Sequence, residues 1–174
     1  NSQSRMLENK LKERGIPYVI YGGLSFYERK EIKDILAYLN LLCNPYADLC
    51  FIRAVGEPKR GIGGVTLDKL SLAAYQRGMT LLEACAIAAE ALPKKAANSL
   101  KSFADMINGL REDMKHMTLF DVVESTLERS GLKNEFAADT SPEGKMRMLN
   151  VEEFLRSVAD FESSIPQPTL EAFL

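Results

Sequence analysis

Apolar residues recur at the three- and four-residue spacing of α-helices through most of this chain. The spacing is clearest in the stripe formed by Ile32, Ile35, Leu36, Leu39 and Leu42. Gly, Pro and capping residues delimit further helical segments near 48–55, 66–77, 80–91, 96–116, 118–130 and 146–161. Only the run 16–21 is β-branched and aromatic enough to predict a strand, and no second run is available to pair with it. We therefore expect a mainly α, multi-helix domain with one short orphan strand near the N-terminus.

The chain is long and apolar enough to form its own core. It has 174 residues, of which 46% are hydrophobic and 26% charged, so no disulfide or metal is needed for stability. The expected core consists of Ile32, Leu36, Leu39, Ile52, Leu67, Leu70, Leu100, Phe103, Ile107, Leu119, Val122, Phe154 and Leu155. Three scattered cysteines without a CxxC pair are typical of buried free thiols in a reducing cytosol. With no apolar run of membrane-spanning length, we expect a cytoplasmic protein with no membrane partner.

Charge and motif content exclude several classes of function. There are 22 Lys and Arg against 24 Asp and Glu, so the net charge of −2 requires any basic surface to be local. His116 is the only histidine, which excludes a His-rich metal site. The chain contains no GxxxxGK(S/T) phosphate loop and no GxSxG or HExxH motif, so we expect no catalytic, metal-binding or cofactor-binding residue. The run 28–34 alternates acids with Lys and Arg, which predicts ion pairs such as Lys30 with Asp34.

A glycine-rich turn between two predicted helices carries the strongest sign of a binding function. The candidate residues in this turn and in the helix after it are Lys59, Arg60, Gly61, Ile62, Gly63, Thr66 and Lys69. The glycines would allow positive φ and a close approach of a partner, so that free N–H groups could bind a phosphate oxygen. The basic residues would add charge, Thr66 a hydroxyl donor, and Ile62 an anchor to the core. A plain glycine-rich turn with solvated basic side chains fits the same residues, and the pattern leaves both interpretations open.

Four motifs follow one another along the chain: NSQSR at 1–5, GGLSF at 22–26, RKEIKD at 29–34 and PKRGIG at 58–63. Over about residues 1–78 the chain thereby resembles the UvrD/PcrA/Rep family of superfamily 1 DNA helicases. The segment RMLNVEEF at 147–154 is more weakly similar to a late Arg-x-Glu-Asn-Leu-x-Glu helix of that family. The chain departs from the family pattern at Gly56, where Asn is usual, at Tyr46 and Ala47, where many members have acids, and at Leu149, which replaces a Glu.

The resemblance implies the helical subdomain 2B of such a helicase. Residues 1–21 would be the trailing helix and strand of motor domain 2A, 22–162 the 2B-like subdomain, and 163–174 a linker returning toward 2A. The orphan strand would then have its partners in 2A. Asn1 would lie at the single-stranded DNA track, and Gly61, Ile62 and Gly63 would form the hairpin that grips the duplex. ATP and Mg would bind in the motor domains of the parent protein, so this chain would have no ATPase activity alone.

Two functions of different class follow from these observations. The first is a regulatory subdomain that binds the backbone of duplex DNA without sequence preference and contacts the other subdomains of a parent helicase. The second is an all-α protein-interaction or autoinhibitory module in which the hairpin is only a turn, with regulatory proteins that the sequence does not identify. A free-standing helix-hairpin-helix protein is disfavoured by the orphan strand and by an N-terminal residue that is not Met, which suggests a piece of a longer protein.

Overall fold

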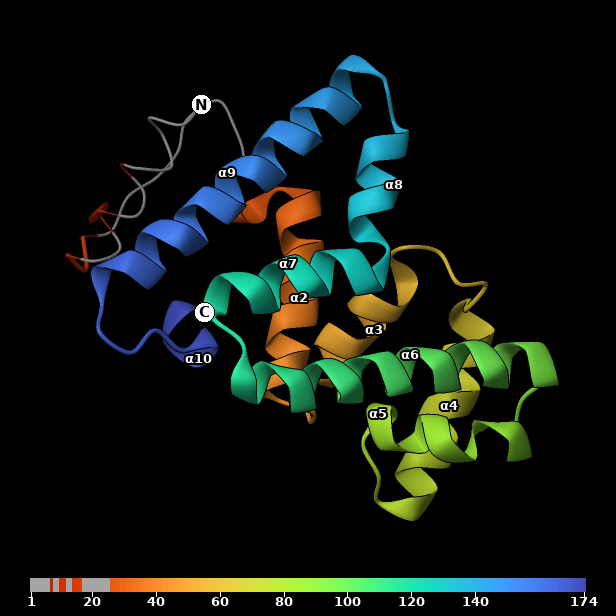
Figure 1. The fold of residues 1–174 in the computed structure, drawn as a ribbon. Helices are drawn as coiled ribbons and strands as arrows, with labels where there is room; N and C mark the ends of the chain where they lie inside the picture. The colour runs from red at the N-terminus through yellow and green to blue at the C-terminus, as the bar shows by residue number, and fades with distance from the viewer. Residues whose placement is uncertain (1–6, 8–9, 12–13, 17–25) are drawn as a thin grey trace.

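The structure, a computed structural model, describes residues 7, 10–11, 14–16 and 26–174. Within these residues the chain is mostly helical and contains no strand, which confirms the predicted helical class (Figure 1). Of the orphan strand predicted at 16–21, only Ile16 is described, and Asn1 also lies outside the described residues. Among the described helices, none combines the length and the apolar character that crossing a membrane requires.

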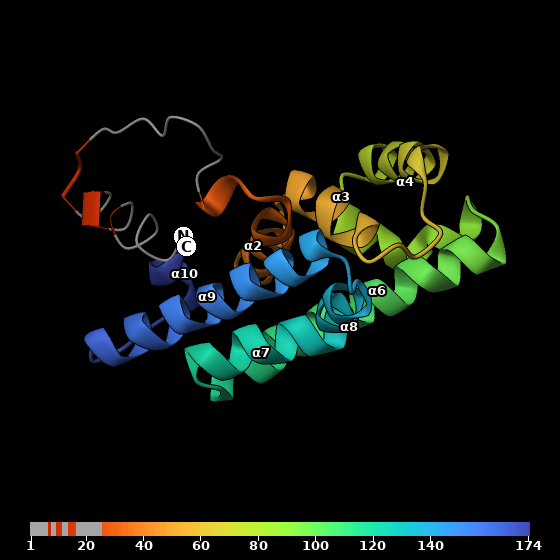
Figure 2. The same ribbon diagram turned by 90° about the horizontal axis from the view of Figure 1, so that it is seen from above.

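One group of helices surrounds α2 (Lys30–Cys43), which follows the short 3-10 helix η1 (Phe26–Glu28). Helix α2 packs against α7 (Leu119–Ser130) and α9 (Pro142–Ser164), and α8 (Leu132–Ala138) joins these two. Helix α10 (Leu170–Phe173) returns to α2, where Leu170 is buried. Figure 2 shows α7 and α9 running alongside one another with α2 above them.

The second group contains the remaining helices, which are α3 (Asp48–Gly56), α4 (Gly64–Arg77), α5 (Leu81–Ala84), the 3-10 helix η2 (Cys85–Glu90) and α6 (Lys94–Asp113). Helix α3 packs on α2, and η2 runs against α6. The 20-residue α6 also contacts α2 and α7, so it joins the two groups before the chain turns through η3 (Met114–His116). Helices α4 and α5 consequently lie at the end of the molecule opposite α9 (Figure 1).

Most of the predicted core residues are buried. The fully buried or nearly buried ones are Ile32, Leu39, Leu70, Leu100, Phe103, Ile107, Leu119, Val122 and Phe154, while Leu36, Leu67 and Leu155 are partly buried against them. The prediction was wrong for Ile52, which is 40% exposed. Helix α3 instead buries Phe51, Ala54 and Val55, because the Phe51 ring packs edge-on against Phe103 at 5.4 Å. A large aromatic ring removes more apolar surface from water than Ile52 would, and it therefore sets the orientation of the helix.

The helix termini follow the capping signals in the sequence. Thr80 and Glu83 form the expected capping box, and Thr118 accepts a hydrogen bond from the N–H of Asp121. The segment predicted as one helix over 80–91 divides into α5 and η2. Helix α9 begins at Pro142 rather than near Met146, because Ser141 caps it and proline is favoured in the first turn. Pro142 and Gly144 therefore lie in the first turn of α9.

Side chains from two distant motifs meet between α2 and α9. The Asn150 side chain accepts a hydrogen bond from Arg29 and donates one to the buried carboxylate of Glu31. The segments 29–34 and 147–154, separated by more than a hundred residues, thus form one polar contact. The predicted pair of Lys30 with Asp34 is not formed, since each of these residues pairs with a side chain outside α2.

Candidate nucleic-acid interface

The hairpin between α3 and α4 exposes its backbone to solvent. Gly61 has φ of +72°, a conformation that side-chain-bearing residues rarely adopt, so glycine is required there. The expectation of positive φ was wrong for Gly63, which lies at φ −103° and ψ 176° in the extended region open to any residue. Both glycines are exposed, and an added Cβ at either would meet no atom within 4 Å. The surface above this backbone is therefore free for a ligand to approach.

Helix α4 begins at the hairpin without a side-chain cap. The carbonyl of Gly63 accepts the N–H groups of Thr66 and Leu67, each at 3.0 Å. Among the residues that the structure describes, the N–H groups of Gly63, Gly64 and Val65 donate no hydrogen bond. These three donors lie at the positive end of a 14-residue helix dipole and can bind an anionic oxygen.

The predicted basic residues divide into two kinds. Lys59 and Lys69 are exposed, and neither has an ion-pair partner in the described part of the chain. Thr66 is half-buried in the first turn of α4, and Ile62 packs against the core as expected. Along the chain, Lys59 precedes the three free N–H groups, and Thr66 and Lys69 follow them on α4.

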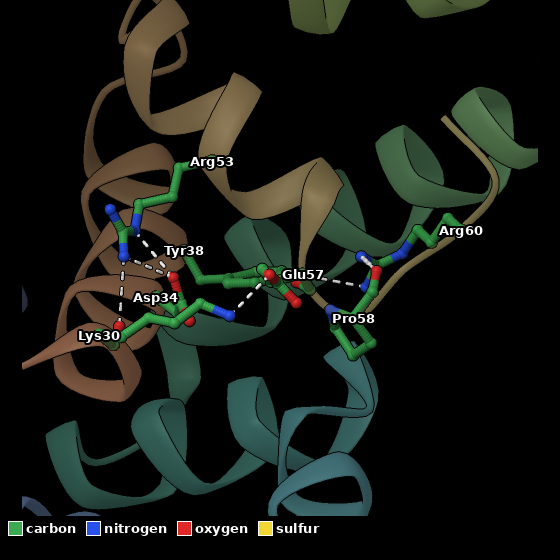
Figure 3. Close-up of polar contacts among 7 residues, drawn as sticks. All are labelled: Lys30, Asp34, Tyr38, Arg53, Glu57, Pro58 and Arg60. Atoms are coloured by element: carbon green, nitrogen blue, oxygen red, sulfur yellow. Dashed lines mark hydrogen bonds and ion pairs between the residues drawn. The ribbon is translucent and has the colours of Figure 1, made fainter. Parts of the chain in front are cut away.

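Arg60, in contrast, points into the protein (Figure 3). Its Nη1 donates to the carbonyl of Pro58 at 2.8 Å and to that of Ala54 at 3.2 Å, in the last turn of α3. Its Nη2 donates to the Tyr38 hydroxyl at 2.7 Å and to the Ser130 carbonyl at 2.8 Å. The guanidinium also lies over the Phe103 ring, with Cζ 5.2 Å from its centroid. Arg60 thus joins the hairpin to α2, α3, α6 and α7 and holds its shape.

A polar cluster continues from Arg60 along α2 (Figure 3). The Tyr38 hydroxyl donates to the Glu57 carbonyl at 2.6 Å, and the Glu57 side chain accepts from Lys30 at 2.8 Å. Burial raises the pKa of Tyr38 far above its ordinary value, so the hydroxyl stays neutral and keeps its donor. Asp34 pairs with Arg53 at 2.8 Å. Burial nevertheless raises the pKa of the Asp34 carboxyl, because the cost of desolvating its charged form outweighs the attraction of the Arg53 cation. The cluster fixes the residues at which the chain enters the hairpin.

Sequence reasoning missed Tyr38 and Ser130 as residues that shape the hairpin. Tyr38 occupies an apolar position of the α2 stripe, where a tyrosine hydroxyl needs a buried partner. That need is a signal in the sequence, but it does not name the partner. The sequence gives no signal for the Ser130 contact, because the acceptor is a backbone carbonyl and any residue at the end of α7 would present the same group.

The proteins to which this chain is similar are DNA helicases. The family model of the UvrD-like helicase C-terminal domain matches residues 1–174. The chain is 39% identical over 175 residues to the ATP-dependent DNA helicase PcrA of Bacillus subtilis, covering 100% of this chain and 24% of that protein. It is 37% identical over 179 residues to DNA helicase II of Escherichia coli and 38% identical over 179 residues to DNA helicase II of Haemophilus influenzae, in each case covering 100% of this chain and 25% of the relative. This chain thus spans about a quarter of the length of these relatives, and it belongs to the UvrD-like helicase C-terminal domain family.

Proposed function

We propose that this chain is the duplex-DNA-binding and regulatory subdomain of an ATP-dependent DNA helicase, and that its hairpin binds the DNA backbone. The observation that carries the proposal is the set of three consecutive N–H groups, at Gly63, Gly64 and Val65, that are exposed and without a protein acceptor among the described residues. A phosphate oxygen of DNA supplies the acceptor that these donors lack. The parent helicase would bind ATP and Mg in its motor domains, act in the cytoplasm and unwind DNA during repair or replication.

Each hairpin residue has a separate role in this proposal. Gly61 supplies the turn, and Gly63 lets a phosphate approach the backbone closely. Lys59 and Lys69 attract the backbone electrostatically, and the Thr66 hydroxyl adds a donor. Arg60 is a positioning residue, because both Nη1 and Nη2 already donate to protein oxygens. Asn1, outside the described residues, would contribute to the single-stranded track.

The contact is expected to be weak and independent of sequence. Lys59 and Lys69 are the lysines near the hairpin that form no ion pair within the described residues, and the net charge is −2, so few counterions are released on binding. We expect an affinity near the non-specific range of about 10⁻⁴ to 10⁻⁶ M, falling as salt rises. Replacing Lys69 with Gln should reduce the slope of log affinity against log salt by about one.

The test compares Gly63→Ala with Gly56→Ala in a salt titration of duplex binding. At both positions an added methyl meets no atom within 4 Å, so both variants should fold, as circular dichroism can check. A methyl at Gly63 would hold a phosphate away from the N–H groups, and losing a hydrogen bond to a charged group should weaken binding about tenfold or more. Gly56 lies before the hairpin, so Gly56→Ala should bind as the unaltered protein does. A folded Gly63→Ala protein with unaltered affinity at every salt concentration would refute the proposal.

A second candidate function rests on apolar side chains that face solvent. On α4, Leu72 is 58% exposed and Tyr75 is 86% exposed, and on α3 Leu49 is 84% exposed. Exposed apolar groups of this size favour a protein-interaction or autoinhibitory surface. If that surface carries the function, a Leu72→Ser and Tyr75→Ser double variant will lose calorimetric binding to the separately purified remainder of the parent helicase, and Gly63→Ala will keep it.

A further inference from the structure

A second polar surface lies beside the hairpin, in a pocket of about 570 Å³. Its walls come from the first turns of α6, from the end of α7 and from Arg60. The buried Phe103 ring contributes apolar surface, and the polar lining residues are Arg60, Lys95, Asn98, Ser99, Ser102, Arg129 and Ser130. Arg60 belongs to both places, since its backbone leads directly into Gly61 while its side chain lines the pocket.

The pocket is rich in positive charge. Its lining includes three cationic side chains and no carboxylate. Arg129 is partly neutralised by Asp113, with Nη1 to Oδ2 at 2.6 Å. The partners of the Arg60 guanidinium are carbonyl and hydroxyl oxygens, which leave its charge uncompensated. Lys95 is exposed and, within the described residues, forms no ion pair. Such a site attracts an anion.

We propose that this pocket binds a phosphate group and, in the duplex complex, holds a second phosphate of the DNA held by the hairpin. The proposal rests on the proposed function, because the two sites adjoin through Arg60. Serine hydroxyls, an Asn amide and a Lys ammonium are donors that contact DNA phosphates, and they position a duplex without reading its bases. The exposure of Lys95, Asn98 and Ser102 leaves the pocket accessible to a polymer that passes over it.

Lys94 provides a matched control for Lys95. Both lysines are exposed in the first turn of α6, and neither forms an ion pair within the described residues. Only Lys95 lines the pocket. Replacing either by Gln changes the net charge equally, so a difference between the two variants reports on the pocket and not on overall electrostatics.

The experiment measures binding of a short duplex across a salt series for Lys95→Gln, Lys94→Gln and Asn98→Asp. We expect Lys95→Gln to lower affinity by about two- to fivefold and the salt slope by about one, and Lys94→Gln to do clearly less. Asn98→Asp places a carboxylate in the pocket and should weaken binding further. Equal effects of the two lysine variants, or an Asn98→Asp protein that binds as well as the unaltered chain, would overturn the proposal.

Two further comparisons separate the alternatives. If Gly63→Ala abolishes binding while Lys95→Gln leaves it unchanged, the pocket proposal fails and the hairpin function stands. If Lys95→Gln weakens binding while Gly63→Ala leaves it unchanged, the hairpin function fails, and with it the proposal that hairpin and pocket hold the same duplex. Titration with inorganic pyrophosphate, followed by amide chemical shifts in α6, distinguishes the source of the phosphate. If pyrophosphate causes saturable chemical-shift changes that Lys95→Gln abolishes, the pocket also binds free phosphates. If Lys95→Gln weakens duplex binding but pyrophosphate causes no such changes, the pocket is a site for the DNA backbone.

Discussion

Arg60→Ala is the substitution that tests most directly how the hairpin is held. The guanidinium makes three hydrogen bonds of 2.7 to 2.8 Å, to Tyr38, Pro58 and Ser130, and it lies over the Phe103 ring. Removing a donor from a buried acceptor costs about 1–3 kcal/mol for each group left unsatisfied. Because water can reach some of these oxygens and such terms are not additive, we expect the free energy of unfolding to fall by about 3–5 kcal/mol.

Urea unfolding followed by far-ultraviolet circular dichroism measures this loss. For a domain of this size the same change lowers the melting temperature by about 6–20 °C. Lys59→Ala, which removes the adjacent exposed charge, should stay within about 0.5 kcal/mol of the unaltered protein. Arg60→Lys should recover only part of the loss, because an ammonium cannot reach oxygens on both sides of a planar fork. An Arg60→Ala protein as stable as Lys59→Ala would show that the network around Arg60 does not stabilise the hairpin.

Three further outcomes are expected. Asn150→Ala removes the polar link between α2 and α9 and should cost about 1–3 kcal/mol in urea unfolding, whereas the neighbouring exposed Leu149→Ala should be nearly neutral. Gly144→Ala would place a methyl in steric overlap with the backbone oxygen of Asp139, so we expect a loss of about 1–3 kcal/mol by thermal melting, and an unchanged melting temperature would contradict the geometry. Burial raises the pKa of the Cys85 thiol to about 12. The folded state therefore keeps this proton at pH values where the unfolded state loses it, and the free energy of unfolding should fall as pH rises above about 9. Urea midpoints across this pH range measure the decrease, with Cys85→Ala as the control.

Sequence alone determined the helical class and most of the helix boundaries. The apolar spacing is local, and residues such as Thr80, Thr118 and Gly78 cap helices through contacts within a few positions of themselves. The motifs also placed the chain in its family, which the match over residues 1–174 confirms. The hairpin residues could be selected because glycines and lysines were grouped within one short segment.

Tertiary packing sets which face of α3 is buried and where the Arg60 side chain lies. Ile52 was expected in the core, but the ring of Phe51 is buried instead, because it packs against Phe103 on α6, far away in sequence. Arg60 had the same local setting as Lys59, yet it lies inside because Tyr38 and the Ser130 carbonyl provide acceptors from other helices. The pocket beside α6 likewise combines residues from three separate segments. Local periodicity and caps act over a few residues, whereas burial and hydrogen-bond partners depend on which distant segments pack together. The hairpin could therefore be located in the sequence, but the role of each of its residues depends on the tertiary structure.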